Sequence, residues 1–204
     1  QKFTTLIQGN INSIYYNDGL FIGKKNEIYR YNEETGNFAL YYQLPDRNLE
    51  IVCIHINKDV LWLGTTTNGV YSLNIDKKEL THPIQKGNIT SFYQDSESEL
   101  WIGSWEEGLF RVKADGTIEN FKYNAKVPHS LSSNFVRACC EDNLGNIWIG
   151  TFNGLNRYNK ITGLFQNHTA NDTQADGLTH SSIWCIVKDN QGTLWLGTYF
   201  GGVN

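Results

Sequence analysis

Apolar and polar residues alternate along the chain in short runs, and these runs come in groups of four. In the copy that begins at Asn134, the runs are NFVRACCED, NIWIGTF, GLNRYNK and TGLFQNH, separated by turn-forming residues. Runs that are rich in β-branched and aromatic side chains and bounded by Gly, Asn or Asp are typical of β-strands. No window shows the helical period of about 3.6 residues. The pattern therefore predicts an all-β chain built from four-stranded antiparallel units.

One motif within these units recurs along the chain. It reads LWLGTTTNGV from Leu61, LWIGSWEEGL from Leu100, IWIGTFNGL from Ile147 and LWLGTYFGGV from Leu194. A more divergent copy, LFIGKKNEI, begins at Leu20. Its glycines are 41, 39, 47 and 47 residues apart and lie at Gly23, Gly64, Gly103, Gly150 and Gly197. Four-stranded units at this spacing are typical of a β-propeller, in which each unit is one blade. We predict about five blades.

The blades are predicted to form one propeller segment, residues 1–204, with units at about 9–45, 46–85, 86–125, 126–170 and 171–204 plus 1–8. The stretch Lys2–Ile7 has the pattern of a fourth strand, whereas the chain ends at Asn204 with two strands and a stub of a third. The two ends could therefore share a blade and close a five-bladed ring. The alternative is that the chain is a slice of a larger propeller.

Two columns of the aligned copies have a physical explanation. A large ring stands on the second strand of every unit, where we expect it to be buried; the ring residues are Phe21, Trp62, Trp101, Trp148 and Trp195. A short polar side chain ends the first strand and can accept a backbone hydrogen bond that starts the hairpin turn; these residues are Asn17, Asn57, Asp95, Asp142 and Asp189. Gly145 and Gly192 are predicted to supply the positive φ of that turn. The motif glycine, two residues after the ring, should let a neighbouring group approach closely.

The charge balance narrows the classes of partner. The chain carries 17 Lys and Arg against 21 Asp and Glu, a formal net charge of -4, which argues against nucleic acid and anionic membrane surfaces. No apolar run approaches the roughly 18 to 20 residues that span a bilayer, and Gln1 is not followed by a basic-then-apolar leader. Because the sequence has no Met, we expect the chain to be processed or cut from a longer one.

The cysteines and histidines do not form a recognisable catalytic or metal-binding pattern. Cys53 and Cys185 share a column with Ser13, Ser91 and Ala138, so we expect small buried thiols there. A vicinal disulfide between Cys139 and Cys140 is the alternative. The histidines have no metal-ligand spacing and are predicted to lie mostly in loops or on the surface; they are His55, His82, His129, His168 and His180. We therefore expect no catalytic residue, no metal and no cofactor in this segment.

The candidate ligand site comes from positions that differ between the copies. The loop after the second strand and the second position of the innermost strand should lie on one face of a propeller. Aromatic rings beside an amide, a carboxylate and an arginine suit a pyranose, which has an apolar C–H face and polar hydroxyls. For any single ring the alternative is packing against the neighbouring blade. The candidates are Trp105, Glu106, Arg137, Phe152, Asn153, Trp184, Tyr199 and Phe200.

The motif also resembles a known family. The pattern Asp-x-x-Gly-x-Leu/Ile-Trp-Ile/Leu-Gly-Thr-x-x-Gly-Leu-x-Arg-Tyr is similar to the two-component regulator propeller repeat, and here it runs from Asp142 to Tyr158. The segment Ser130–Val136 resembles the inter-blade linker of that family. The likeness covers the whole chain and is weakest in the first copy, where Lys24 and Glu27 replace the Thr and Gly. The signatures of WD40 and kelch repeats are missing, and the sialidase Asp-box is out of register by one residue.

The resemblance implies a function that composition and spacing do not supply. Such repeats form the periplasmic half of hybrid sensor kinases in glycan-degrading Gram-negative bacteria, with more blades, one membrane span and a cytoplasmic kinase. It implies a non-enzymatic sensor segment that binds an oligosaccharide, acts in a homodimer of the parent sensor and reaches the membrane only through a helix outside this segment. It also favours the slice over the closed ring. The alternatives are a propeller enzyme, either a polysaccharide lyase or a glycosidase, and a purely structural scaffold.

Overall fold

The structure is a computed structural model that describes residues 5–17, 19–170 and 177–204. These residues form eighteen β-strands and no helix, so nothing among them is a helix long and apolar enough to cross a bilayer. The chain divides into two compact units, Gln1–Ile89 and Thr90–Asn204. The predicted all-β class of four-stranded antiparallel blades is confirmed.

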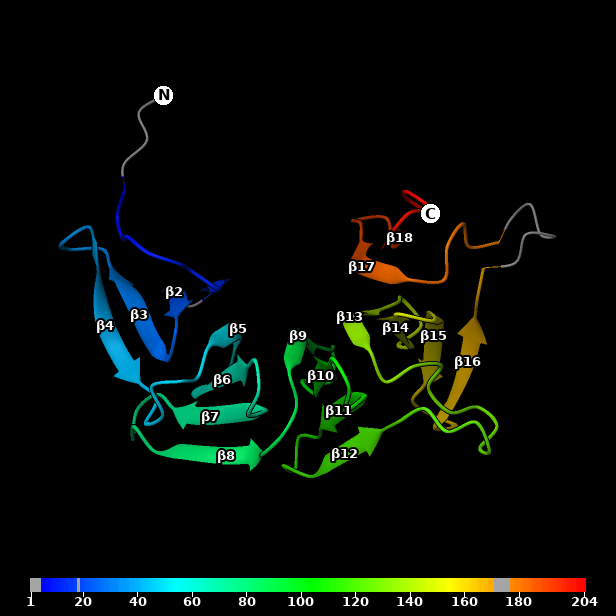
Figure 1. The fold of residues 1–204 in the computed structure, drawn as a ribbon, viewed down its shortest axis with the longest axis horizontal. Helices are drawn as coiled ribbons and strands as arrows, with labels where there is room; N and C mark the ends of the chain where they lie inside the picture. Colours follow the sequence, from blue (N-terminus) through cyan, green and yellow to red (C-terminus); the bar gives the residue numbers. More distant parts are fainter. Residues whose placement is uncertain (1–4, 18, 171–176) are drawn as a thin grey trace. The chain divides into compact units, whose positions relative to one another are not determined.

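The first unit contains two four-stranded meanders with their strands in sequence order (Figure 1). Their strands are β1 (Ser13–Asn17), β2 (Gly19–Lys24), β3 (Glu27–Asn32), β4 (Asn37–Gln43), β5 (Ile51–Asn57), β6 (Val60–Thr65), β7 (Val70–Asn74) and β8 (Leu80–Ile84). Buried side chains from both sheets share one core, for example Phe21 and Ile28 from the first sheet and Ile54 and Leu63 from the second. Alternation along each strand thus gives every sheet a face that packs on its neighbour.

The second unit contains two further four-stranded meanders and a two-stranded sheet. Their strands are β9 (Ile89–Gln94), β10 (Leu100–Ser104), β11 (Leu109–Val112), β12 (Ile118–Phe121), β13 (Val136–Glu141), β14 (Ile147–Thr151), β15 (Gly154–Asn159), β16 (Leu164–His168), β17 (Ile183–Lys188) and β18 (Leu194–Thr198). One core joins Trp101 to Ile149 and Tyr158. A second core joins Leu155 of β15 to Ile186 of β17 in the last sheet.

The shared blade was predicted to combine the first residues of the chain with the last ones. Residues 2–4 of the predicted Lys2–Ile7 strand lie outside the described residues, and residues 5–7 lie in no strand. At the other end, Val203 makes an isolated antiparallel bridge with Gly197, which is the predicted stub of a third strand.

The polar residue that ends the first strand holds the ring of the second strand. One oxygen of Asp142 accepts the backbone N–H groups of Leu144 and Asn146, both at 2.9 Å, as the turn interpretation predicts. Its other oxygen accepts the indole N–H of Trp148 at 2.8 Å. The same indole bond recurs from Trp101 to Asp95 at 2.8 Å and from Trp195 to Asp189 at 2.9 Å.

The predicted roles of the glycines are confirmed. The turn glycines Gly145 and Gly192 have φ of 78° and 91°. A Cβ on the motif glycine Gly150 would lie 2.7 Å from Cγ2 of Ile183 on the next sheet, and one on Gly103 would lie 3.0 Å from Cγ1 of Val136. Gly103 and Gly150 therefore let the first strand of the next sheet approach closely.

A buried lysine links two sheets of the second unit. Lys160 Nζ lies 2.8 Å from Asp95 Oδ2 and 3.1 Å from Glu141 Oε1. Glu141 also accepts the backbone N–H and the hydroxyl of Ser96, at 2.8 and 2.9 Å. Burial alone would raise the pKa of Asp95, but the hydrogen bonds from Lys160 and Trp101 outweigh it and lower that pKa. The pair therefore stays charged between the sheets.

Some predictions for the cysteines and histidines are corrected. All four cysteines are free, so the alternative disulfide between Cys139 and Cys140 is not formed, and burial raises the pKa of Cys53 to about 12. Cys185 is exposed rather than buried, because it lies on the side of the two-stranded sheet that no other described sheet covers. Three histidines lie in strands rather than in loops, and each contacts an aromatic ring: His82 and His168 stack on their partners, and His55 meets Tyr15 edge-on.

Replacing Trp101 with Ala should destabilise the protein far more than replacing Trp195. Trp101 is fully buried, whereas Trp195 is 50% exposed, although both bond to the turn carboxylate. We expect losses of about 3 to 5 kcal/mol for Trp101→Ala and about 1 kcal/mol for Trp195→Ala, measured by urea unfolding. Equal losses would contradict the packing described for the second unit.

Acid should remove the stabilisation that Asp142 provides. Burial tends to raise the pKa of Asp142, but hydrogen bonds from Asn146 and Trp148 lower it overall. A carboxyl with a lowered folded pKa stabilises the fold above its unfolded pKa, about 4, and loses this effect as the pH falls further. Asp142→Asn should therefore cost about 1 kcal/mol above pH 5, allowing for solvent screening. The wild-type and Asn curves should converge near pH 2 in unfolding experiments; a constant gap at every pH would contradict this.

Candidate functional site

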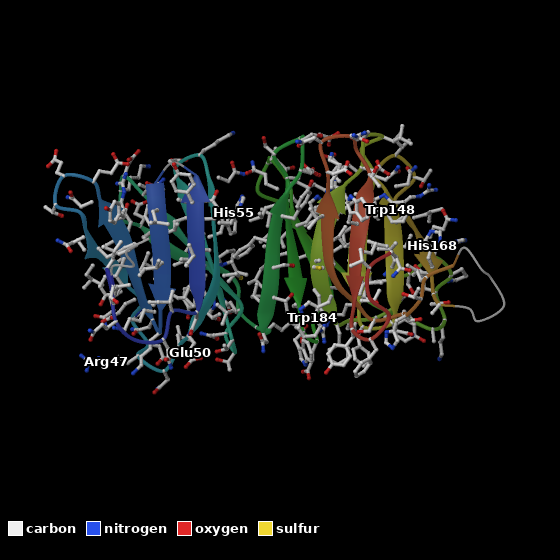
Figure 2. The ribbon with its side chains drawn as sticks, turned by 90° about the horizontal axis from the view of Figure 1, so that it is seen from above. Arg47, Glu50, His55, Trp148, His168 and Trp184 are labelled. Atoms are coloured by element: carbon white, nitrogen blue, oxygen red, sulfur yellow. The ribbon has the colours of Figure 1, made fainter. Side chains whose placement is uncertain are left out.

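Two of the candidate side chains are placed by β-bulges. In β13, Val136 pairs with Thr151 and Ala138 pairs with Gly150, so Arg137 is the extra residue. The same register shift in β17 makes Trp184 the extra residue. A bulge leaves its extra residue outside the ladder and re-aims its side chain. Figure 2 shows Trp184 at the opposite end of the strands from Trp148.

Arg137 lies against two tryptophans. Its guanidinium carbon is 3.8 Å from the ring centroid of Trp184 and 4.9 Å from that of Trp105, within cation–π range. A pocket of about 230 Å³ is lined by these three residues and Thr90. The Thr90 hydroxyl donates to the carbonyl of Val136 at 2.6 Å, so its proton is already used.

The rings continue on both sides of this pocket. The ring centroids of Trp184 and Tyr199 are 5.5 Å apart, and those of Tyr199 and Phe200 are 4.3 Å apart. On the other side, Phe135 lies 5.3 Å from Trp105 and 6.1 Å from Phe152. We call this set the aromatic face; its members are Trp105, Phe135, Arg137, Phe152, Trp184, Tyr199 and Phe200.

The exposure of these rings distinguishes them from the core. Trp184, Tyr199 and Phe152 are 52%, 54% and 55% exposed, whereas the column residue Trp101 is fully buried. The described sheets therefore leave these three rings uncovered. Sequence reasoning missed Phe135, which lies in the linker just before β13; its place next to the variable second position of that strand was the available signal.

Two candidates lie beside the aromatic face without joining it. Glu106 is exposed in the loop between β10 and β11, and Asn153 is exposed in the loop between β14 and β15. Within the described ranges, neither makes a ring contact or a side-chain hydrogen bond with the face. The neighbouring carboxylate, Glu107, is paired with Lys122 at 2.7 Å. The adjacent glutamates therefore do not act as a pair.

Arg137 differs from Arg111, an arginine that lies over a motif tryptophan. Its Nε is buried without a hydrogen-bond partner among the described residues, and burial lowers its pKa despite the opposing effect of Tyr199. Arg111, over the ring of Trp101, instead donates to Glu99 at 2.7 Å. For Arg111 burial also favours the neutral form, but Glu99 outweighs it and the pKa is raised.

A larger hollow, about 810 Å³, lies on the first sheet and is lined in part by Tyr16 and Leu40. Tyr16 is 79% exposed, whereas Ile56, at the corresponding position of β5, is 5% exposed because the first sheet covers it. This hollow is therefore the uncovered face of a blade, unlike the smaller pocket at Arg137, which lies among the candidate residues. No group of His, Cys, Asp and Glu in the described part of the chain is arranged to hold a metal ion.

Removing Arg137 should cost little stability, in contrast to removing Arg111. Met keeps most of the apolar stem of Arg. We expect Arg137→Met to change the free energy of unfolding by less than about 1 kcal/mol. Arg111→Met should cost about 3 kcal/mol, because it leaves the buried Glu99 unpaired. Urea unfolding of the two variants checks this, and a larger loss for Arg137→Met would show that its guanidinium has a structural partner.

Three segments of the chain, residues 83–106, 130–153 and 177–200, match the model of the two component regulator propeller family. None of the curated proteins compared with the chain matches it.

Solved structures share the fold over nearly the whole chain. The extracellular domain of the putative hybrid two component system BT4673 from B. thetaiotaomicron aligns with a TM-score of 0.77 and 22% identity, covering 100% of this chain and 28% of that one. The corresponding domain of BT3049 from the same organism gives 0.57 and 21%, covering 100% and 34%. PorZ, a surface component of the type-IX secretion system of Porphyromonas gingivalis, gives 0.66 and 14%, covering 95% and 32%.

This chain thus spans about a third or less of each of these structures, and the likeness establishes the fold. The matched segments coincide with the last three copies of the motif, where the turn carboxylate holds the indole. The chain is therefore a β-propeller segment in which three stretches match the model of the two component regulator propeller family.

Proposed function

We propose that this chain is the ligand-binding propeller segment of a periplasmic sensor in a hybrid two-component system, and that its aromatic face binds an oligosaccharide. The observation that carries the proposal is the run of half-exposed rings around Arg137. The kinase would lie elsewhere in the parent protein, and this segment would not be an enzyme.

The aromatic face has the chemistry that a sugar requires. Contiguous exposed apolar surface is uncommon on soluble proteins unless it binds something. Adjacent rings at Trp184, Tyr199 and Phe200 offer flat surfaces for the C–H faces of successive pyranose units. Arg137 and the indole N–H groups supply hydrogen-bond donors for the hydroxyls.

The relatives support the sensor part of the proposal. The matched repeats are named for two component regulators, and two of the similar structures are extracellular domains of putative hybrid two component systems. PorZ has the same fold in a secretion system, so the fold by itself does not decide the function. The choice of a ligand-binding role therefore depends on the aromatic face.

Signalling by such a segment requires differential binding. We expect the parent sensor to be a homodimer with two arrangements. The saccharide shifts the balance between them only if it binds one arrangement more tightly than the other.

The charge pattern favours binding over catalysis. Glycosidases place two opposed carboxyl groups about 5 to 9 Å apart across the substrate. The described residues that line the Arg137 pocket include no carboxylate, and Glu107 is engaged by Lys122. The opposed carboxyl pair of a glycosidase is therefore not found among the residues that line this pocket.

The test is calorimetric titration of the full protein that carries this chain with a panel of bacterial and plant oligosaccharides. Trp184→Ala should weaken binding of the active saccharide at least about tenfold, or about 1.4 kcal/mol. Trp195→Phe is the matched control, because Trp195 is equally exposed on the same sheet but bonds to the turn at the other end of its strand. Unchanged affinity in Trp184→Ala, with the protein still folded, would count against the proposal.

A further inference from the structure

We propose that the pocket at Arg137 binds an anionic substituent of the saccharide, either the carboxylate of a uronic acid or a sulfate ester. This inference rests on the proposed function and specifies its ligand as an acidic oligosaccharide. It is carried by an unpaired guanidinium at the centre of the aromatic face.

The guanidinium is positioned but not neutralised. The bulge in β13 aims it between Trp105 and Trp184, and its Nε is buried there. Its Nε has no hydrogen-bond partner among the described residues. A cation removed from water without a counter-charge is unfavourable, so an anion that enters this pocket gains more than it would at an exposed arginine.

Arg111, another arginine over a tryptophan in the second unit, has acidic partners within the fold. Arg111 lies 5.2 Å above Trp101, a distance similar to that of Arg137 from Trp105, and Glu99 and Glu119 both pair with it. At Arg137 none of the four residues that line the pocket is acidic. The counter-charge that Glu99 provides within the blade is therefore left for a ligand to provide here.

The size of the pocket agrees with a substituent rather than a whole sugar chain. About 230 Å³ is less than the roughly 300 to 1,000 Å³ of pockets that enclose complete small ligands. The rings of Tyr199 and Phe200 extend beyond it. A saccharide would thus lie across the rings and place one charged group against Arg137, where charge-assisted hydrogen bonds are about twice as strong as neutral ones.

The experiment compares matched pairs of probes on the full protein. One arm uses uronate-containing disaccharides and their carboxyl-reduced forms, and the other uses sulfated disaccharides and their desulfated forms. Within one pair, the acidic member should bind at least about tenfold more tightly, and the arm that contains this pair identifies the anion. Arg137→Gln should remove the difference, and added salt should weaken the acidic member selectively.

Two controls separate this inference from the proposed function. Arg157→Gln removes another arginine whose Nε is buried and unpartnered, at the ring of Trp148 and outside the pocket, and should leave binding unchanged. Trp184→Ala should weaken acidic and neutral members alike. If acidic and neutral members bind equally, and only Trp184→Ala weakens them, the charge inference is overturned and the binding role stands. If no member binds, or if Trp184→Ala has no effect, both are overturned.

Discussion

In the last three sheets, the fold depends on a carboxylate that follows the first strand and accepts the indole N–H of the second strand. In the fourth sheet, Asp142 fixes the turn through one oxygen and Trp148 through the other. Hairpin geometry and ring position are thereby set by the same side chain. Two residues further on, Gly150 leaves room for Ile183 of the next sheet. Local structure and contact between sheets thus depend on the same few residues, which explains why the motif recurs with so little change.

The four-stranded blades could be predicted from the sequence, because alternation of apolar and polar residues and the turn residues are local signals. The turn role of Asp142 followed from its spacing, but its bond to the indole did not, because alternation does not specify which way two side chains six residues apart point. Cys185 was wrongly expected to be buried. Residues at its position in the repeat are buried only where another sheet packs on them, and no other described sheet covers Cys185. The variable second position of strand one identified Arg137 and Trp184, yet the bulge that aims them is a backbone feature without a distinct residue signature. Phe135 was missed because only the second position of the first strand was compared between the copies, and Phe135 lies just before that strand.

The candidate site uses the repeat as a rigid support. The motif residues hold each blade, and the residues that vary between copies stand at the ends of the strands and in the loops. This division is common where one fold supports many binding functions. Here the variable positions have brought together several half-exposed rings and one guanidinium that has no internal counter-charge. The proposed binding of a saccharide and the proposed preference for an acidic one therefore depend on the same pocket.

The central claim is that the aromatic face, and not the motif tryptophans, meets the ligand. The most direct measurement is the indole N–H spectrum of the ¹⁵N-labelled protein with and without a saccharide that binds. The sequence contains six tryptophans, so each resonance can be assigned by single substitution. The account predicts that the Trp105 and Trp184 resonances shift, while those of the buried Trp101 and of Trp148 do not. Shifts confined to Trp101 and Trp148, with Trp105 and Trp184 unmoved, would contradict it.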